Sequence, residues 1–282
     1  MIEPPRRILF ATDFSGRCDR PLERSLRLAR RWRSSLILLH VLEPPSSDLT
    51  DGECRAEEAR IEKKLRSEAL GAEVEIRTMI AKGPIPATIA RVAEETDADL
   101  IVTGVARYNG FGDFILGTNV DRLVRRTDVP VLTVKERATS DYRNLLVATD
   151  FSNCSAMALE AAAGFFPDAA LNLAHAYQVP LEPILGREAH APALQAEIAR
   201  ELDDFLNNVH VSTEVRERID IHVDYGEIRQ VIGGLVESME IDLAAIGTHG
   251  KSGFVAATIG SDAKKLLESL ACDVLLVPDD IP

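Results

Sequence analysis

The sequence predicts an α/β protein built from two tandem three-layer α/β/α domains, each around an open five-stranded sheet. The length of 282 residues allows about two domains at roughly 150 residues each. The chain also repeats itself, because RILFATDFS at residues 7–15 returns as NLLVATDFS at residues 144–152. Within each half, short apolar runs alternate with longer segments of helical period, which is the pattern of βαβ units and a parallel sheet.

Further strand-like runs correspond between the two halves. The pairs are LILLHVLEP (36–44) with LNLAHAYQVP (171–180), DADLIVTG (97–104) with EIDLAAIG (240–247), and TDVPVLTV (127–134) with LACDVLLV (270–277). A repeat of this extent indicates a duplicated fold. We therefore expect a first domain over residues 1–138 and a second over residues 139–282.

Amphipathic segments between these strands are expected to form helices. In the first half they lie at about 17–32, 52–70, 85–96 and 117–126, and the clearest in the second half lie at 192–209 and 260–270. Strands that are apolar throughout, such as LIVTG, belong in a sheet covered on both faces, and right-handed crossovers then produce three layers. Ligands of such sheets bind at the carboxyl ends of the strands.

Composition and charge exclude several classes of protein. With 46% hydrophobic and 27% charged residues, the chain resembles an average globular protein rather than a disordered or fibrous one. The formal net charge of −13 argues against binding of nucleic acid. We find no run of about 18 apolar residues and no signal-peptide pattern, so we expect no membrane association and a cytoplasmic location.

The cysteines and most histidines carry no recognisable spacing. The four cysteines are scattered without a CxxC pair, which favours a reducing compartment and small buried side chains over disulfides. His190, His210 and His222 likewise have no metal-type spacing, so we predict no protein-bound metal site.

A glycine-rich loop in the second half is the clearest candidate binding element. GTHGKSGFVAATIGS (247–261) follows a predicted strand and opens a predicted helix. Gly247, Gly250 and Gly260 permit positive φ and close approach of the backbone to a phosphate, Ser261 adds a hydroxyl, and the helix start supplies free N–H groups. The alternative is that Gly247 only ends a strand and that Gly260 with Ser261 only caps a helix.

Asp150 is expected at the same edge of the sheet as this loop. A carboxylate there can accept ribose hydroxyls or hold a phosphate-bound Mg²⁺, although it can also cap the helix that follows. His175 lies within an apolar strand and is expected to pack in the core, whereas His249 in the loop is the better ligand candidate.

The ATDFS start, the LILLHV strand and the GTHGKSG…GS loop together resemble the universal stress protein family in its tandem, ATP-binding form. The resemblance implies the strand order 3-2-1-4-5 and ATP bound at the strand ends. It places Ala148, Thr149 and Asp150 at the adenosine, the backbone of Ala176 at adenine, and Gly247, Gly250, Gly260 and Ser261 at the phosphates, with Asp262 beside them. It also implies an intramolecular pseudo-dimer through the last strands, and leaves open a homodimer of whole chains.

The first half departs from this pattern. Its corresponding stretch GVARYNGFGDFILGT (104–118) has Arg107 where the second half has Gly250. Arginine lacks the conformational freedom of glycine, so we expect a degenerate site there and a competent one in the second half.

The resulting hypothesis is an ATP-binding stress-response regulator. The alternatives are a slow metal-dependent ATPase, although no nucleophilic triad is evident, or a protein-interaction scaffold without nucleotide. Residues 1–138 carry 23 basic and 22 acidic side chains, whereas residues 139–282 carry 9 and 23, so nearly all the net negative charge is in the second half. The arginine-rich segment 20–33 is either a solvated helix face or a docking site for an acidic protein partner.

Overall fold

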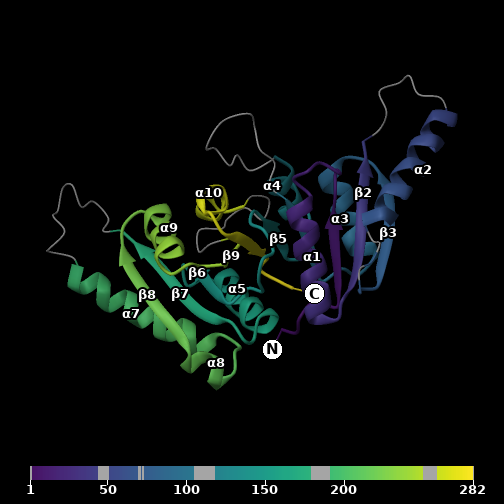
Figure 1. The fold of residues 1–282 in the computed structure, drawn as a ribbon. Helices are drawn as coiled ribbons and strands as arrows, with labels where there is room; N and C mark the ends of the chain where they lie inside the picture. Colours follow the sequence, from purple (N-terminus) through teal and green to yellow (C-terminus); the bar gives the residue numbers. More distant parts are fainter. Residues whose placement is uncertain are drawn as a thin grey trace. The chain divides into compact units, whose positions relative to one another are not determined.

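The computed structural model describes residues 2–43, 51–68, 71, 73–104, 118–178, 191–249 and 259–281. The chain divides into two compact units, coloured purple to teal and teal to yellow in Figure 1. The first unit is formed chiefly by Pro4–Asp141 and the second chiefly by Tyr142–Asp280. None of the described helices is both long enough and apolar enough to cross a lipid bilayer.

The first unit contains a parallel sheet of five strands in the order β3-β2-β1-β4-β5. The strands are β1 (Arg7–Ala11), β2 (Ser35–Leu42), β3 (Ile76–Lys82), β4 (Leu100–Gly104) and β5 (Val131–Val134). The helices are α1 (Asp19–Trp32), α2 (Asp51–Glu68), α3 (Ile85–Glu95) and α4 (Thr118–Val124). This order confirms the predicted fold class.

The second unit repeats this plan in the order β8-β7-β6-β9-β10. Its strands are β6 (Asn144–Ala148), β7 (Ala170–Tyr177), β8 (Ile219–Tyr225), β9 (Leu243–Gly247) and β10 (Asp273–Val277). Its helices are α5 (Asn153–Phe165), α7 (Ala191–Asn208), α8 (Thr213–Glu217), α9 (Ile228–Ser238) and α10 (Ser261–Ser269). The repeat did not predict α8, a short helix capped locally by Ser212, whose side chain accepts the Val215 N–H at 3.2 Å.

The order of the strands places a crevice at the carboxyl edge of each sheet. From β1 the chain adds β2 and β3 on one side of β1, and it then crosses to β4 and β5 on the other side. Because each crossover is right-handed, α1 and α2 lie on one face of the sheet and α3 and α4 on the opposite face. Helix α3 packs against α4, and α9 packs against α10, as this requires. Ligands of such sheets bind where the direction reverses, which is between β1 and β4 and between β6 and β9.

The arginines of α1 bind the chain that follows β5 in the same unit. Four of them are involved: Arg20 donates to the carbonyl of Lys135, Arg24 to the carbonyl of Ser140, and Arg27 and Arg31 to the carboxylate of Asp141. Arg24 is only 4% exposed. Arg24 is therefore not part of a solvated face, whereas Arg20 and Arg31 are exposed as that interpretation expects. Docking of an acidic partner stays a prediction.

Asp141 is expected to make stability depend on pH. Burial of its carboxyl raises the pKa, but the hydrogen bonds and charges of Arg27 and Arg31 outweigh burial and hold the pKa below its ordinary value. A lowered native pKa adds stability above the ordinary value of about 3.9, and that stability is lost as the pH falls through the native pKa.

Asp141→Asn should therefore lower the free energy of unfolding of the first unit at about pH 7. The difference from the wild type should shrink as the pH falls below about 4 and vanish once the pH is below the native pKa of Asp141. The fluorescence of Trp32, the one tryptophan of the chain, reports on this unit. Glu62→Gln, which removes an exposed ion pair with Arg66, is the control and should have little effect. A pH-independent loss in Asp141→Asn would contradict the account.

Candidate functional site

The repeated ATDFS segment forms the same turn in both units. In the second unit, the Thr149 hydroxyl accepts the Phe151 N–H at 2.9 Å, and the Asp150 carboxylate accepts the Ser152 N–H at 3.1 Å. Phe151 takes a φ of 61°, which is rare for a residue other than glycine. The turn places Asp150 directly after β6, at the carboxyl edge of the sheet.

A histidine from the neighbouring strand supports each of these turns. His175 Nδ1 lies 2.8 Å from the carbonyl oxygen of Thr149, which can only accept, so Nδ1 carries the proton. The His175 ring stacks on Phe151 at 4.3 Å between centroids, and in the first unit His40 stacks on Phe14 at 4.7 Å. His175 therefore packs against the turn as expected, but it is half-buried and does not lie in the core.

The threonine of the turn is expected to contribute measurably to stability. Thr12 is 5% exposed and its hydroxyl accepts the Phe14 N–H at 3.0 Å, so Thr12→Val leaves this half-buried donor without its acceptor. Such a loss costs about 1–3 kcal/mol, measurable by Trp32 fluorescence during denaturation. Thr133 in β5 is fully buried and its hydroxyl has no hydrogen-bond partner among the described residues, so Thr133→Val should be neutral or stabilising. Equal losses in the two variants would contradict this role.

A cavity of about 110 Å³ in the second unit brings most of the sequence-predicted site residues together. Nine of the ten line it: Ala148, Thr149, Asp150, Ala176, Gly247, His249, Gly260, Ser261 and Asp262. The tenth, Gly250, lies outside the described residues, as do Lys251 and Ser252. The nine converge because β6, β7 and β9 are adjacent parallel strands whose carboxyl ends meet at one edge.

Sequence reasoning missed the apolar wall of this cavity. Ile228 and Ile232 of α9, Ile246 of β9 and Leu266 of α10 also line it. Ile228 and Ile232 are four positions apart and therefore share one face of α9, a signal that the sequence does contain. The cavity thus has an apolar side and a polar side.

The polar side includes the start of α10. Gly260 is its N-cap and no described side chain caps the first turn, so the N–H groups there remain open to an anion. The N–H of Gly260 itself donates to the Thr248 carbonyl at 2.8 Å, and Lys265 pairs with Asp262 at 2.7 Å. Helix α5, in contrast, is capped by Ser152, so Asp150 is not its cap.

Gly247 has a packing role that the sequence analysis did not anticipate. A Cβ added there would lie 2.8 Å from the Cys154 carbonyl carbon and 2.9 Å from its oxygen, so only glycine allows α5 to approach β9 this closely. Gly260 has a φ of −54°, and Gly247 is not among the described glycines with positive φ. The expected use of positive φ at these two positions was therefore wrong.

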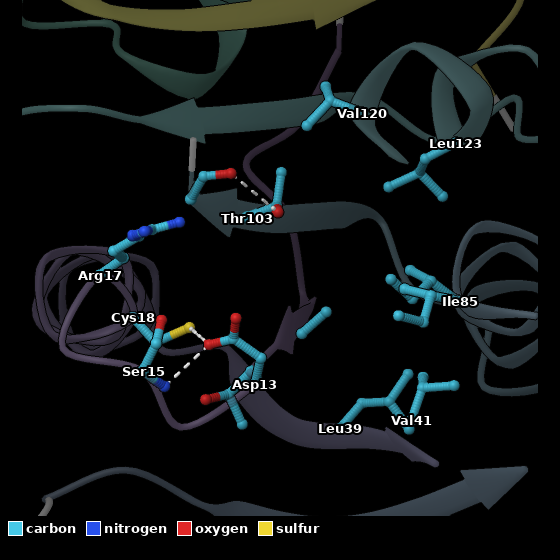
Figure 2. Close-up of a pocket in the computed structure, with 14 residues that line it drawn as sticks. Asp13, Ser15, Arg17, Cys18, Leu39, Val41, Ile85, Thr103, Val120 and Leu123 are labelled. Atoms are coloured by element: carbon cyan, nitrogen blue, oxygen red, sulfur yellow. Dashed lines mark hydrogen bonds between the residues drawn. The ribbon is translucent and has the colours of Figure 1, made fainter. Parts of the chain in front are cut away.

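The corresponding cavity of the first unit is more apolar and has different polar residues (Figure 2). Asp13 accepts the Ser15 N–H at 2.8 Å and the Cys18 thiol at 3.1 Å. Burial raises the pKa of Asp13, but these hydrogen bonds and the Arg17 charge together lower it by more. The pKa of Asp13 therefore lies below its ordinary value. Figure 2 shows these groups on one side of the cavity and Ile85 on the other. Arg107, expected to intrude on this site, lies outside the described residues.

The cysteines only partly match their expected role as buried apolar side chains. Cys154 and Cys272 are buried, but Cys18 is half-buried and its thiol is bonded to Asp13. The thiol of Cys154 also has polar neighbours, since its sulfur accepts the His249 N–H at 3.4 Å and lies 3.3 Å from the Val277 carbonyl oxygen. The side chain of Cys54 lies outside the described residues.

Comparison with known proteins gives a consistent result. The Universal stress protein family matches residues 4–135 and 141–278. Universal stress protein E of Photorhabdus laumondii is 25% identical over 225 residues, covering 74% of this chain and 70% of that protein. The crystal structure of a universal stress protein from Archaeoglobus fulgidus shares the fold, at 16% identity and a TM-score of 0.69, covering 98% of this chain and 97% of that one. Another structure from this organism, a complex with dAMP, is 22% identical, covering 47% of this chain and 97% of its own at a TM-score of 0.34.

Proposed function

Since the chain belongs to the universal stress protein family, we propose that it is a nucleotide-dependent stress-response regulator whose second unit binds ATP. One observation carries the proposal: an apolar wall, a carboxylate and a helix start that no described side chain caps line the same cavity at the carboxyl edge of the sheet. These three surfaces match the base, the ribose and the phosphates of a nucleotide.

Each part of the cavity suits one part of ATP. The apolar side chains of Ile228 and Ile232 are suited to the faces of adenine, with the backbone of Ala176 nearby for its polar edge. The Asp150 carboxylate is suited to the ribose hydroxyls, as carboxylates are in other α/β nucleotide sites. The open N–H groups of α10 and the positive end of its dipole are suited to the phosphates.

Charge neutralisation is a particular requirement of this site. The second half of the chain has 9 basic and 23 acidic side chains, so its overall field repels a polyphosphate. The oxygen donors of Ser261 and Asp262, at the start of α10, are of the kind that Mg²⁺ prefers. These residues fit a Mg²⁺ ion that enters with the nucleotide and offsets its charge.

Thermal unfolding of the full chain with ATP and Mg²⁺ tests the proposal. A ligand that binds only the native state stabilises it, by about 2.7 kcal/mol at a concentration about 100 times its Kd. We expect ATP to raise the midpoint of the wild type and of Asp13→Ala, and to have little effect on Asp150→Ala. Absence of a shift in the wild type would favour the nucleotide-free scaffold, and a shift lost only in Asp13→Ala would place the site in the first unit.

A further inference from the structure

A second cluster of ligand-type side chains lies at the edge of the same unit. Cys154 at the start of α5, His249 after β9 and Asp279 after β10 each offer a donor atom, and these atoms all lie within 4.8 Å of one another. We propose that these three side chains bind a divalent transition-metal ion, with Zn²⁺ as the best match. Zn²⁺ binds thiolate, imidazole and carboxylate ligands, whereas Mg²⁺ and Ca²⁺ prefer oxygen ligands. This set of donors therefore favours Zn²⁺.

The geometry requires only a small rearrangement. His249 Nδ1 lies 3.8 Å from Asp279 Oδ2, whereas donors around a tetrahedral Zn²⁺ ion lie roughly 3.3–3.8 Å apart. The Asp279 side chain is 61% exposed and can turn toward the ion, while Cys154 is 2% exposed and fixed. The His249 side chain is 23% exposed, so the cluster is open to solvent on one side. Three protein ligands leave a fourth position for water or another oxygen donor.

The present contacts of two of the ligands differ in what metal binding requires of them. The Thr248 hydroxyl lies 2.9 Å from His249 Nδ1, the same nitrogen that faces Asp279, so this contact must be given up when Nδ1 binds a metal ion. The sulfur of Cys154 is held by the His249 N–H and, as described above, Gly247 lets α5 pack closely enough to bring it there.

Metal binding would replace the proton of the Cys154 thiol. Burial and the hydrogen bond to Asp279 together raise the pKa of this thiol to about 12. A bound cation supplies the positive charge that a thiolate beside a carboxylate requires.

The first unit differs at the same positions. In the alignment of the two repeats, Cys154 corresponds to Arg17, His249 to Ala106 and Asp279 to Glu136. The first unit therefore has the positively charged guanidinium of Arg17 in place of the Cys154 thiol, whereas the acidic residue is retained as Glu136. We expect the first unit to bind no metal at this position.

Titration of the reduced, nucleotide-free full chain with Zn²⁺ and with Co²⁺ tests the inference. We expect one Zn²⁺ per chain by calorimetry, and a sulfur-to-cobalt charge-transfer band in the near ultraviolet with Co²⁺. Cys154→Ser should abolish the band, and Asp279→Asn, a change at an exposed residue that leaves the fold intact, should weaken Zn²⁺ binding by at least about tenfold.

Cys272→Ser is the matched control, because Cys272 is a buried cysteine of the same unit that is not part of the cluster. It should keep both the band and the Zn²⁺ affinity. The inference is overturned if the wild type binds no stoichiometric Zn²⁺, if the band survives in Cys154→Ser, or if Asp279→Asn binds Zn²⁺ as the wild type does. These experiments contain no nucleotide, so their failure is separate from failure of the proposed ATP site.

Discussion

Gly260→Asp is expected to reduce the affinity of the full chain for ATP by at least about tenfold while leaving the fold as stable as before. Gly260 has a φ of −54°, which any residue can adopt, and it is the N-cap of α10. An aspartate there accepts the N–H groups of the first turn and adds a negative charge where we propose that the phosphates bind. Replacing glycine by aspartate at an N-cap changes stability by only about a few tenths of a kcal/mol.

Gly260→Ser is the matched control for this variant. Serine caps the same N–H groups without a charge, so it should weaken ATP binding less than aspartate does. Calorimetric titration with ATP measures the affinity, and thermal unfolding without ATP confirms that both variants fold. Affinity in Gly260→Asp equal to that of the wild type would show that the phosphates do not bind at the start of α10.

Gly247→Ala is expected to lower the free energy of unfolding of the second unit by about 1–3 kcal/mol. The added Cβ would lie 2.8 Å from the carbonyl carbon of Cys154 and 2.9 Å from its oxygen, and these backbone atoms cannot turn away as a flexible side chain would. Gly233→Ala in α9 is the control, because an added Cβ there meets nothing within 4 Å. It should stabilise the helix by about 0.5–1 kcal/mol.

Hydrogen exchange measured by mass spectrometry separates the two units in this comparison. Faster exchange in peptides from α5 and β9 of Gly247→Ala, with unchanged exchange in the first unit, is the expected result. Unchanged exchange throughout would mean that the added Cβ of Gly247→Ala is accommodated without loss of stability. Gly247 would then not be required for the packing of α5 on β9.

The fold followed from the sequence because local and global signals agree. The apolar strands and the duplicated ATDFS turn each specify the same element twice, which predicted the elements and the duplicated fold. The strand order was implied by the resemblance to the universal stress protein family, and both units have it. Helix α8 was missed because it is five residues long, depends on a local cap and falls outside the repeat. The acceptors of the α1 arginines were not predicted, because they lie at residues 135–141 and are remote in sequence.

The candidate site was predictable where residues follow adjacent strands. Asp150 and Gly260 meet at one cavity because the carboxyl ends of parallel strands share an edge. The role of Gly247 was not predictable, since it depends on the distance between α5 and β9. The grouping of Cys154, His249 and Asp279 was not predictable either, because their separation in the sequence shows no metal-type spacing.

The number of ATP molecules bound per chain tests the central claim most directly. Native mass spectrometry of the full chain with ATP and Mg²⁺ measures it. We predict one nucleotide per wild-type chain and none on Gly260→Asp at the same ATP concentration. No nucleotide on the wild type, two nucleotides per chain, or one retained on Gly260→Asp would contradict a single ATP site in the second unit.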